Sequence, residues 1–195
     1  NGVLFFDEVN RCPEKIQNSL LQVLEEGIAT LGGYAIDIPT NFIFIATMNP
    51  HEVAATEKLS DVFMDRLDVI TMGYPDTATI ERGIVKGKGK VLDVEFPDDV
   101  LKKLIDFVRR VRRNKDVSKK PSVRVSIGLY ERAQANALLR GRDKVEPADV
   151  SDAILSVLSH RIELKPSLKY IQSVEDFLTE QLKKDDLGSD GGGLV

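Results

Sequence analysis

The sequence predicts an α/β region followed by an all-helical region. Two apolar runs support the first part, because each has the length and composition of a strand buried in a parallel sheet; they cover residues 2–6 (GVLFF) and 42–47 (FIFIAT). A third observation supports the second part: beyond residue 74 the apolar residues recur at helical spacing. The order of elements before that point, with strands and helices alternating, is typical of an α/β fold.

The α/β part contains four further predicted elements. A helix begins at Pro13, where the fixed φ of proline suits a first turn, and ends at Gly27. Segments with an alternating pattern flank Gly32-Gly33 and predict a β-hairpin. The last two elements are a short helix over 61–66, capped by Ser60, and a third strand over 69–72.

The part after Tyr74 is predicted to be a bundle of four or five helices. They are expected over residues 76–86, 97–111, 122–140, 146–160 and 173–183, with a basic linker over 112–120. The predicted domains are therefore 1–74 and 75–185. Residues 186–195 are rich in glycine and are expected to form a disordered tail.

The composition describes a globular protein and limits its partners. Of 195 residues, 42% are hydrophobic and 30% are charged, and the net charge is −4. The acidic balance argues against a protein whose whole surface binds nucleic acid. The single cysteine, Cys12, excludes an internal disulfide and fits a cytoplasmic protein. No apolar run reaches the ~18 residues of a membrane helix. Because the chain opens with Asn1 inside a strand, we expect it to be the carboxyl-terminal part of a longer protein.

Polar residues follow both buried strands and suggest phosphoryl transfer. Asp7 and Glu8 end the first strand, and Asn49 follows the second. In open α/β sheets, ligands bind beyond the carboxyl ends of the strands, so these residues are expected to converge. Asp7 would bind magnesium, Glu8 would orient the attacking water, and Asn49 would hold that water or a phosphate oxygen. An acidic pair that merely opens a helix is the alternative; Asn49 and the strand order favour the catalytic interpretation.

Several motifs resemble those of one family in the same order. Residues 2–13 resemble the Walker B segment of MoxR-type AAA+ ATPases. The later matches are the pre-sensor 1 hairpin at 30–38, sensor 1 at 46–50, the arginine-finger segment at 64–68, sensor 2 at 122–124, and the late lid sequence at 139–150 with 160–162. The resemblance covers residues 2 to 162. It implies a partial AAA+ P-loop NTPase core followed by an all-α lid domain, with the phosphate-binding loop lying before residue 1.

The resemblance assigns roles to two arginines. Arg66 would be the finger that reaches the nucleotide of a neighbouring subunit; the alternative is a surface ion pair with Asp65 or Asp68. Arg124 would contact the γ-phosphate and couple the nucleotide state to the lid, the alternative being a solvated arginine. Arg11 fits either a subunit interface or a surface salt bridge.

The resemblance also implies the function. It implies ATP and Mg²⁺ as cofactors, self-assembly into a hexameric ring, and chaperone-like remodelling of partner proteins or metalloenzymes, among them proteins with a von Willebrand factor A domain. The alternatives are a magnesium-chelatase-like or helicase-related AAA+ motor, and a non-catalytic assembly module. Neither nucleic acid nor a membrane is an expected partner. Without its phosphate loop, and with the strand over 69–72 lacking its main pairing partner, the isolated chain is expected to bind ATP poorly and to swap, associate or be unstable.

Some features depart from the family or carry no role. Leu67 stands where the family often has phenylalanine, and residues 51–59 and 87–120 match weakly. Residues 87–90 (GKGK) lack the spacing of a phosphate-binding loop. The basic run from Arg109 to Lys120 is interpreted as a solvated face and linker. His51, His160 and Cys12 have no metal-ligand spacing.

Overall fold

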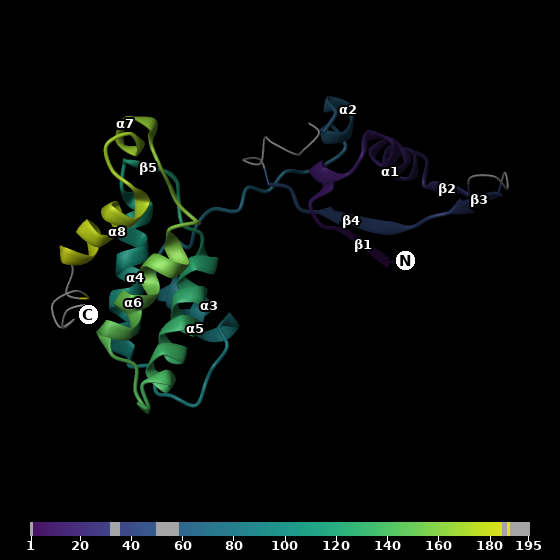
Figure 1. The fold of residues 1–195 in the computed structure, drawn as a ribbon. Helices are drawn as coiled ribbons and strands as arrows, with labels where there is room; N and C mark the ends of the chain where they lie inside the picture. The colour runs from purple at the N-terminus through teal and green to yellow at the C-terminus, as the bar shows by residue number, and fades with distance from the viewer. Residues whose placement is uncertain (1, 32–35, 50–58, 185–186, 188–195) are drawn as a thin grey trace. The chain divides into compact units, whose positions relative to one another are not determined.

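The computed structural model describes residues 2–31, 36–49, 59–184 and 187. The chain forms two compact units, Asn1–Thr71 and Met72–Val195 (Figure 1). In the part of the chain that is described, no helix has the length and apolar character needed to span a membrane.

A parallel pair of strands organises the first unit. Strand β1 (Gly2–Phe6) pairs in parallel with β4 (Phe42–Ala46), and Phe6 lies opposite Ala46 at their carboxyl ends. The predicted parallel arrangement is confirmed. The chain between them contains one 3₁₀ turn, a helix and an antiparallel hairpin: η1 (Val9–Arg11), α1 (Glu14–Glu26), β2 (Ile28–Leu31) and β3 (Ile36–Pro39).

The helix boundaries of this unit follow the sequence signals. Helix α1 has Pro13 as its N-cap and ends at Gly27, whose φ of 65° is the left-handed conformation that glycine adopts without a Cβ penalty. The short helix α2 (Asp61–Met64) begins at Ser60, whose hydroxyl accepts a hydrogen bond from the Phe63 amide at 3.1 Å. The predicted turn at Gly32-Gly33 lies outside the described residues, as does His51.

The predicted burial of the two strands on both faces is wrong. Residues of β4 alternate, so that Phe44 faces a small core with Phe63 while Ile43 is 66% exposed. In β1, Val3 is 63% exposed. The reason is that the described residues supply only two strands to this sheet and a core on one face, formed around Val9, Leu59 and Phe63.

The predicted third strand is also wrong. Residues 69–72 form no strand, and Ile70 and Met72 are 82% and 88% exposed. A strand needs a neighbour to satisfy its backbone groups, and β1 pairs only with β4 in the described sheet. The apolar composition of this segment alone therefore does not make it a strand.

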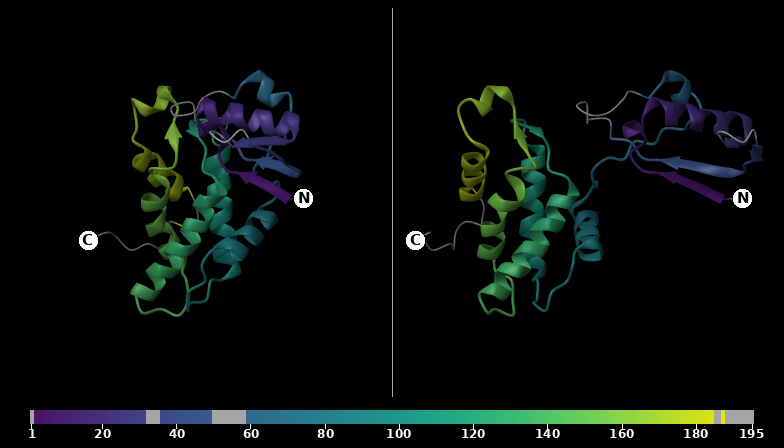
Figure 2. Two further views of the ribbon diagram at one scale, coloured as in Figure 1. Left: turned by 90° about the vertical axis from the view of Figure 1, so that its right-hand side faces the viewer. Right: turned by 45° about the vertical axis from the view of Figure 1, so that its right-hand side comes forward.

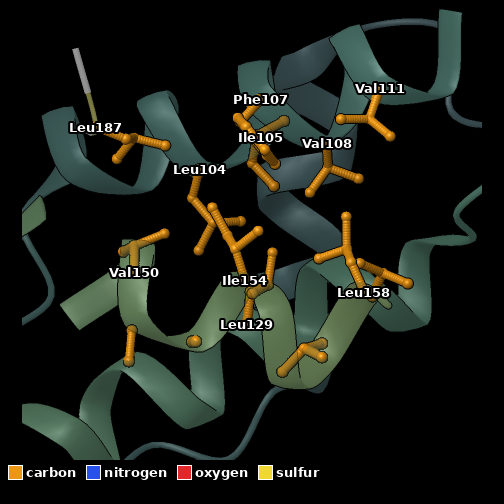
Figure 3. Close-up of a cluster of buried hydrophobic side chains, with 14 of the residues drawn as sticks. Leu104, Ile105, Phe107, Val108, Val111, Leu129, Val150, Ile154, Leu158 and Leu187 are labelled. Atoms are coloured by element: carbon orange, nitrogen blue, oxygen red, sulfur yellow. The ribbon is translucent and has the colours of Figure 1, made fainter. Parts of the chain in front are cut away.

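Six helices of the second unit are described, and they pack around one apolar core (Figure 2). Figure 3 shows its centre, where Leu104 and Val108 approach Leu129 and Ile154 from neighbouring helices. Leu187, inside the predicted disordered tail, is also buried in this core. The helices are α3 (Ala78–Lys88), α4 (Asp98–Arg113), α5 (Val123–Leu139), α6 (Pro147–Leu158), α7 (Pro166–Lys169) and α8 (Val174–Lys183).

The basic linker differs most from its prediction. Helix α4 continues to Arg113, and residues 117–119 form strand β5 (Val117–Lys119), antiparallel to β6 (Glu163–Leu164). Arg112 is buried, because both of its terminal nitrogens pair with the carboxylate of Glu81 on α3, at 2.8 Å each. Part of the basic run is therefore an internal ion pair, not a solvated face.

The late lid motif forms the connection between α5 and α6. Asp149 is buried, and its carboxylate accepts a hydrogen bond from the Glu146 amide at 2.9 Å in a capping box. The same carboxylate pairs with Arg140 at 2.8 Å and with Arg142. Gly141 turns the chain between these arginines with a φ of 67°. This motif therefore fixes the angle at which α6 leaves α5.

Candidate functional site

The candidate site begins where β1 and β4 end together. The parallel ladder continues past both strands: the Thr47 amide donates to Phe6 O, and the Val9 amide donates to Thr47 O, each at 3.0 Å. These bonds place Thr47 beside the acidic pair. Its hydroxyl donates a hydrogen bond to the Asp7 carboxylate and accepts one from the Glu8 amide at 2.9 Å.

Thr47 is the site residue that the sequence interpretation missed. Thr47 is the last residue of the predicted strand over 42–47, and β-branched residues are common in strands. Its residue type therefore did not mark it as a functional residue. The available signal was its register: in a parallel pair, the residue after β4 lies opposite the residue after β1. A hydroxyl at that position meets the carboxylate of Asp7.

Glu8 has a constrained backbone. Its φ of 53° and ψ of 51° are left-handed, a conformation that costs a non-glycine residue ~1–2 kcal/mol. Among the described residues it is the one non-glycine residue with positive φ. The Thr47 hydroxyl holds its amide, and its carboxylate pairs with Arg11 at 3.0 Å, both side chains being 46% exposed. The Arg11 interaction is thus a surface salt bridge within the same loop.

Asn49 lies at the same edge as the acidic pair. The backbone carbonyl oxygen of Asn49 accepts a hydrogen bond from the side-chain amide of Asn10 at 3.2 Å. This bond ties the loop after β4 to the loop after β1. Asn10 is 6% exposed, and its Oδ1 has no hydrogen-bond partner among the described residues. The loops that carry Asp7, Glu8 and Asn49 are therefore joined twice, through Thr47 and through Asn10.

Arg66 is held within its own unit. It follows α2, and its guanidinium pairs with Glu25 of α1 at 2.8 Å and donates to Val62 O at 2.6 Å. Its acidic partner within the described residues is thus Glu25, and neither Asp65 nor Asp68. The side chain is 28% exposed. An exposed ion pair of this kind is weak, so Arg66 can exchange Glu25 for another anion at little cost.

Arg124 belongs to the second unit, whereas the acidic pair belongs to the first. It is the second residue of α5, is exposed, and follows the N-cap Ser122, whose side chain makes no capping hydrogen bond. The first turn of α5 thus presents backbone N–H groups and one arginine, a combination that favours anions.

The acidic pair suits a magnesium ion that is also held by a nucleotide. The described residues contain no group of three or more His, Cys, Asp or Glu side chains able to form a complete metal cage. Magnesium bound with a nucleotide does not need one, because it takes one or two carboxylates together with phosphate and water oxygens. Asp7 offers an exposed carboxylate of this type at the sheet edge.

Comparisons with known proteins agree with this fold. Residues 1–69 match the family described as ATPase family associated with various cellular activities (AAA), and residues 119–181 match the AAA lid domain. The chain is 32% identical to YeaC of Bacillus subtilis, covering 87% of this chain and 60% of YeaC. It is also 32% identical to the chaperone MoxR1 of Mycobacterium tuberculosis, covering 83% of this chain and 50% of MoxR1.

One solved structure supports the fold alone. A RuvB mutant of Thermotoga maritima has a TM-score of 0.55 and 19% identity, covering 79% of this chain and 44% of that chain. The fold and the site define the class: the chain is an ATPase core segment of AAA type followed by an AAA lid. Within that class it belongs to the MoxR-type AAA+ ATPase family. It spans about half to three fifths of the length of these two relatives.

Proposed function

We propose that this protein is an ATP-hydrolysing MoxR-type ATPase in which Glu8 orients the attacking water. One observation carries the proposal: a single hydroxyl, that of Thr47, bonds both the Asp7 carboxylate and the Glu8 amide at the carboxyl ends of two parallel strands. This fixes the Asp7 carboxylate and the backbone of Glu8 in one place through a group that carries no charge. Phosphoryl transfer depends on such positioning, because most of its catalysis comes from orientation and electrostatics.

The roles of the acidic pair follow from their lengths and surroundings. Asp7, held by Thr47, would bind magnesium with ATP; the ion, when bound, neutralises charge on the phosphates. Glu8 is one methylene longer and would hold the attacking water and accept its proton. To act, its carboxylate must release Arg11, and this costs little because both partners are half-exposed.

Three further residues have proposed roles in hydrolysis. Asn49 would hold the water or a γ-phosphate oxygen, since its loop is tied to that of the acidic pair. Arg124 would contact the γ-phosphate from the first turn of α5. Arg66 would leave Glu25 and stabilise charge on the phosphoryl group in a neighbouring subunit, which requires a ring.

The work done by hydrolysis is proposed from the family. The relative named chaperone MoxR1 supports remodelling of partner proteins as the role. A hexameric ring would supply Arg66 in trans, and a protein with a von Willebrand factor A domain is the proposed client. A cytoplasmic location agrees with the single free thiol of Cys12.

The test is Glu8→Gln in the full-length protein, with Glu14→Gln as the matched control on the exposed first turn of α1. Glu8→Gln should keep ATP binding and lower hydrolysis by about 10²-fold or more, the usual contribution of a general base. The control should hydrolyse ATP normally. Near-normal hydrolysis by Glu8→Gln would remove Glu8 from this role.

A further inference from the structure

A buried carboxylate in the second unit connects the start of α5 to the segment that enters this unit. Glu81 of α3 is fully buried and accepts four hydrogen bonds. Two come from Arg112 at 2.8 Å, one from the Ser126 hydroxyl at 2.7 Å and one from Arg109 at 3.2 Å. Each carboxylate oxygen thus receives two donors, so the group is fully satisfied.

The two arginines extend this network to the backbone. The Arg112 Nε donates to Pro121 O at 2.8 Å, and the Arg112 guanidinium lies 4.6 Å from the centre of the Tyr74 ring. Arg109 donates to the carbonyl oxygens of Pro75 and Asp76, each at 2.8 Å. The network therefore holds residues 74–76, which come directly after the boundary between the units.

The same network holds α5 on both sides of Arg124. Pro121 lies three residues before it and Ser126 two residues after it, and both are bonded to the network. The N-cap Ser122 makes no side-chain hydrogen bond, and these two bonds tie the first turn to the network, beside the buried side chain of Val125. A single carboxylate thereby sets the position of Arg124 relative to residues 74–76.

We propose that Glu81 and Ser126 are positioning residues for Arg124. This rests on the proposed contact of Arg124 with the γ-phosphate. A rigid first turn holds the guanidinium in one orientation for the proposed contact with the γ-phosphate, and ADP, which lacks that phosphate, gains nothing from it. The network should therefore raise the preference of the protein for ATP over ADP without acting on the nucleotide itself.

Ser126→Ala is the sharpest test, because it removes one uncharged donor to the Glu81 carboxylate and keeps a good helix former in the helix interior. The measurement is the dissociation constant of the full-length Glu8→Gln protein for fluorescent ATP and ADP analogues. Ser126→Ala should weaken ATP binding by about threefold to tenfold, a range typical of residues that share one hydrogen-bond network. ADP binding should stay unchanged, while the unfolding temperature should fall, because the buried carboxylate loses one of its four donors. Ser156→Ala on α6, where the hydroxyl bonds only its own helix, is the matched control.

A double-mutant cycle separates this role from a merely structural one. In an Arg124→Ala background, Ser126→Ala should have no further effect on ATP binding, because the group that it positions is gone. An equal loss in both backgrounds would overturn the proposal. If Arg124→Ala itself leaves the ATP preference unchanged, the contact of Arg124 with the γ-phosphate fails, and the positioning role fails with it. If only Arg124→Ala changes the preference, Arg124 keeps its role and Ser126 loses its own.

Discussion

The hydroxyl of Thr47 donates a hydrogen bond to the carboxylate of Asp7, across the carboxyl ends of two parallel strands. The donor and the acceptor are 40 residues apart in the sequence. The same hydroxyl accepts a hydrogen bond from the Glu8 amide, so it also fixes the backbone turn that carries the Glu8 carboxylate. The pair of acidic residues is thus oriented by a neutral side chain on the neighbouring strand.

Thr47→Val should reduce ATP hydrolysis in the full-length protein by about tenfold or more, because it keeps the side-chain shape and removes both hydrogen bonds that orient the acidic pair. The matched control is Thr30→Val on β2, where the lost hydroxyl bonds Asp37 at 2.9 Å. Steady-state phosphate release measures both. If the two variants lose activity equally, Thr47 has no special role in the site.

Arg66→Ala should lower hydrolysis by about 10³-fold or more, as expected of an arginine finger. Glu25→Gln removes only the ion-pair partner of Arg66, so it should leave hydrolysis near normal and cost less than ~1 kcal/mol of stability. The measurement is steady-state hydrolysis.

Mixed rings test whether Arg66 acts between subunits. Subunits with Arg66→Ala retain Glu8, and subunits with Glu8→Gln retain Arg66, so adjacent copies can complete one site. Mixing the two inactive proteins should restore part of the hydrolysis. Mixtures that stay as inactive as their components would count against action in trans.

The isolated chain of 195 residues should self-associate through the exposed faces of β1 and β4. These strands carry an apolar surface whose exposure to water is unfavourable. It includes Val3, Phe5 and Ile43, each more than half exposed. Ile43→Thr keeps a β-branched residue in the strand and should shift the association to higher concentration. Sedimentation velocity measures this. Ile80→Thr on α3, also exposed, is the control, and an equal effect of both would point to general hydrophobicity.

The local features of this fold could be predicted from the sequence, whereas contacts between residues far apart in the sequence could not. Gly27, Ser60 and Pro97 mark helix ends because capping depends on a few neighbouring residues. The parallel pairing of β1 and β4 followed from two apolar runs. Residues 69–72 are similarly apolar, yet a strand also needs a neighbouring strand to pair with. The presence of that neighbour cannot be read from the sequence of the segment itself.

The same contrast between local signals and contacts of distant residues holds for the candidate site. Asp7, Glu8 and Asn49 were predicted as site residues because polar residues that follow apolar runs stand out, and the structure places them at one edge of the sheet. Thr47 did not stand out, because threonine is common in strands. The burial of Arg112 was missed because its partner, Glu81, lies 31 residues earlier on another helix. A basic run looks solvated until the carboxylate that faces it is known.

The stability of the second unit should depend on pH through Glu81. Burial by itself raises the pKa of this carboxyl, but the hydrogen bonds from Arg112 and Ser126 and the charge of Arg112 outweigh it, so the pKa lies below its ordinary value of 4.5. A carboxyl whose pKa is lower in the folded state stabilises the fold above the pKa of the unfolded chain. This contribution is lost as the pH falls below 4.5 through the folded-state pKa.

Glu81→Gln should therefore destabilise the protein at pH 7 by ~3 kcal/mol, because it leaves Arg109 and Arg112 without their buried counter-charge. It should also flatten the dependence of stability on pH below 4.5. Urea denaturation followed by helical circular dichroism, repeated from pH 7 to pH 3, measures both. Asp98→Asn is the control: the pKa of Asp98 is also lowered, by its hydrogen bond from Lys86, but the carboxylate is exposed and salt screens the pair. The idea fails if the pH profile of Glu81→Gln runs parallel to that of the unmodified protein.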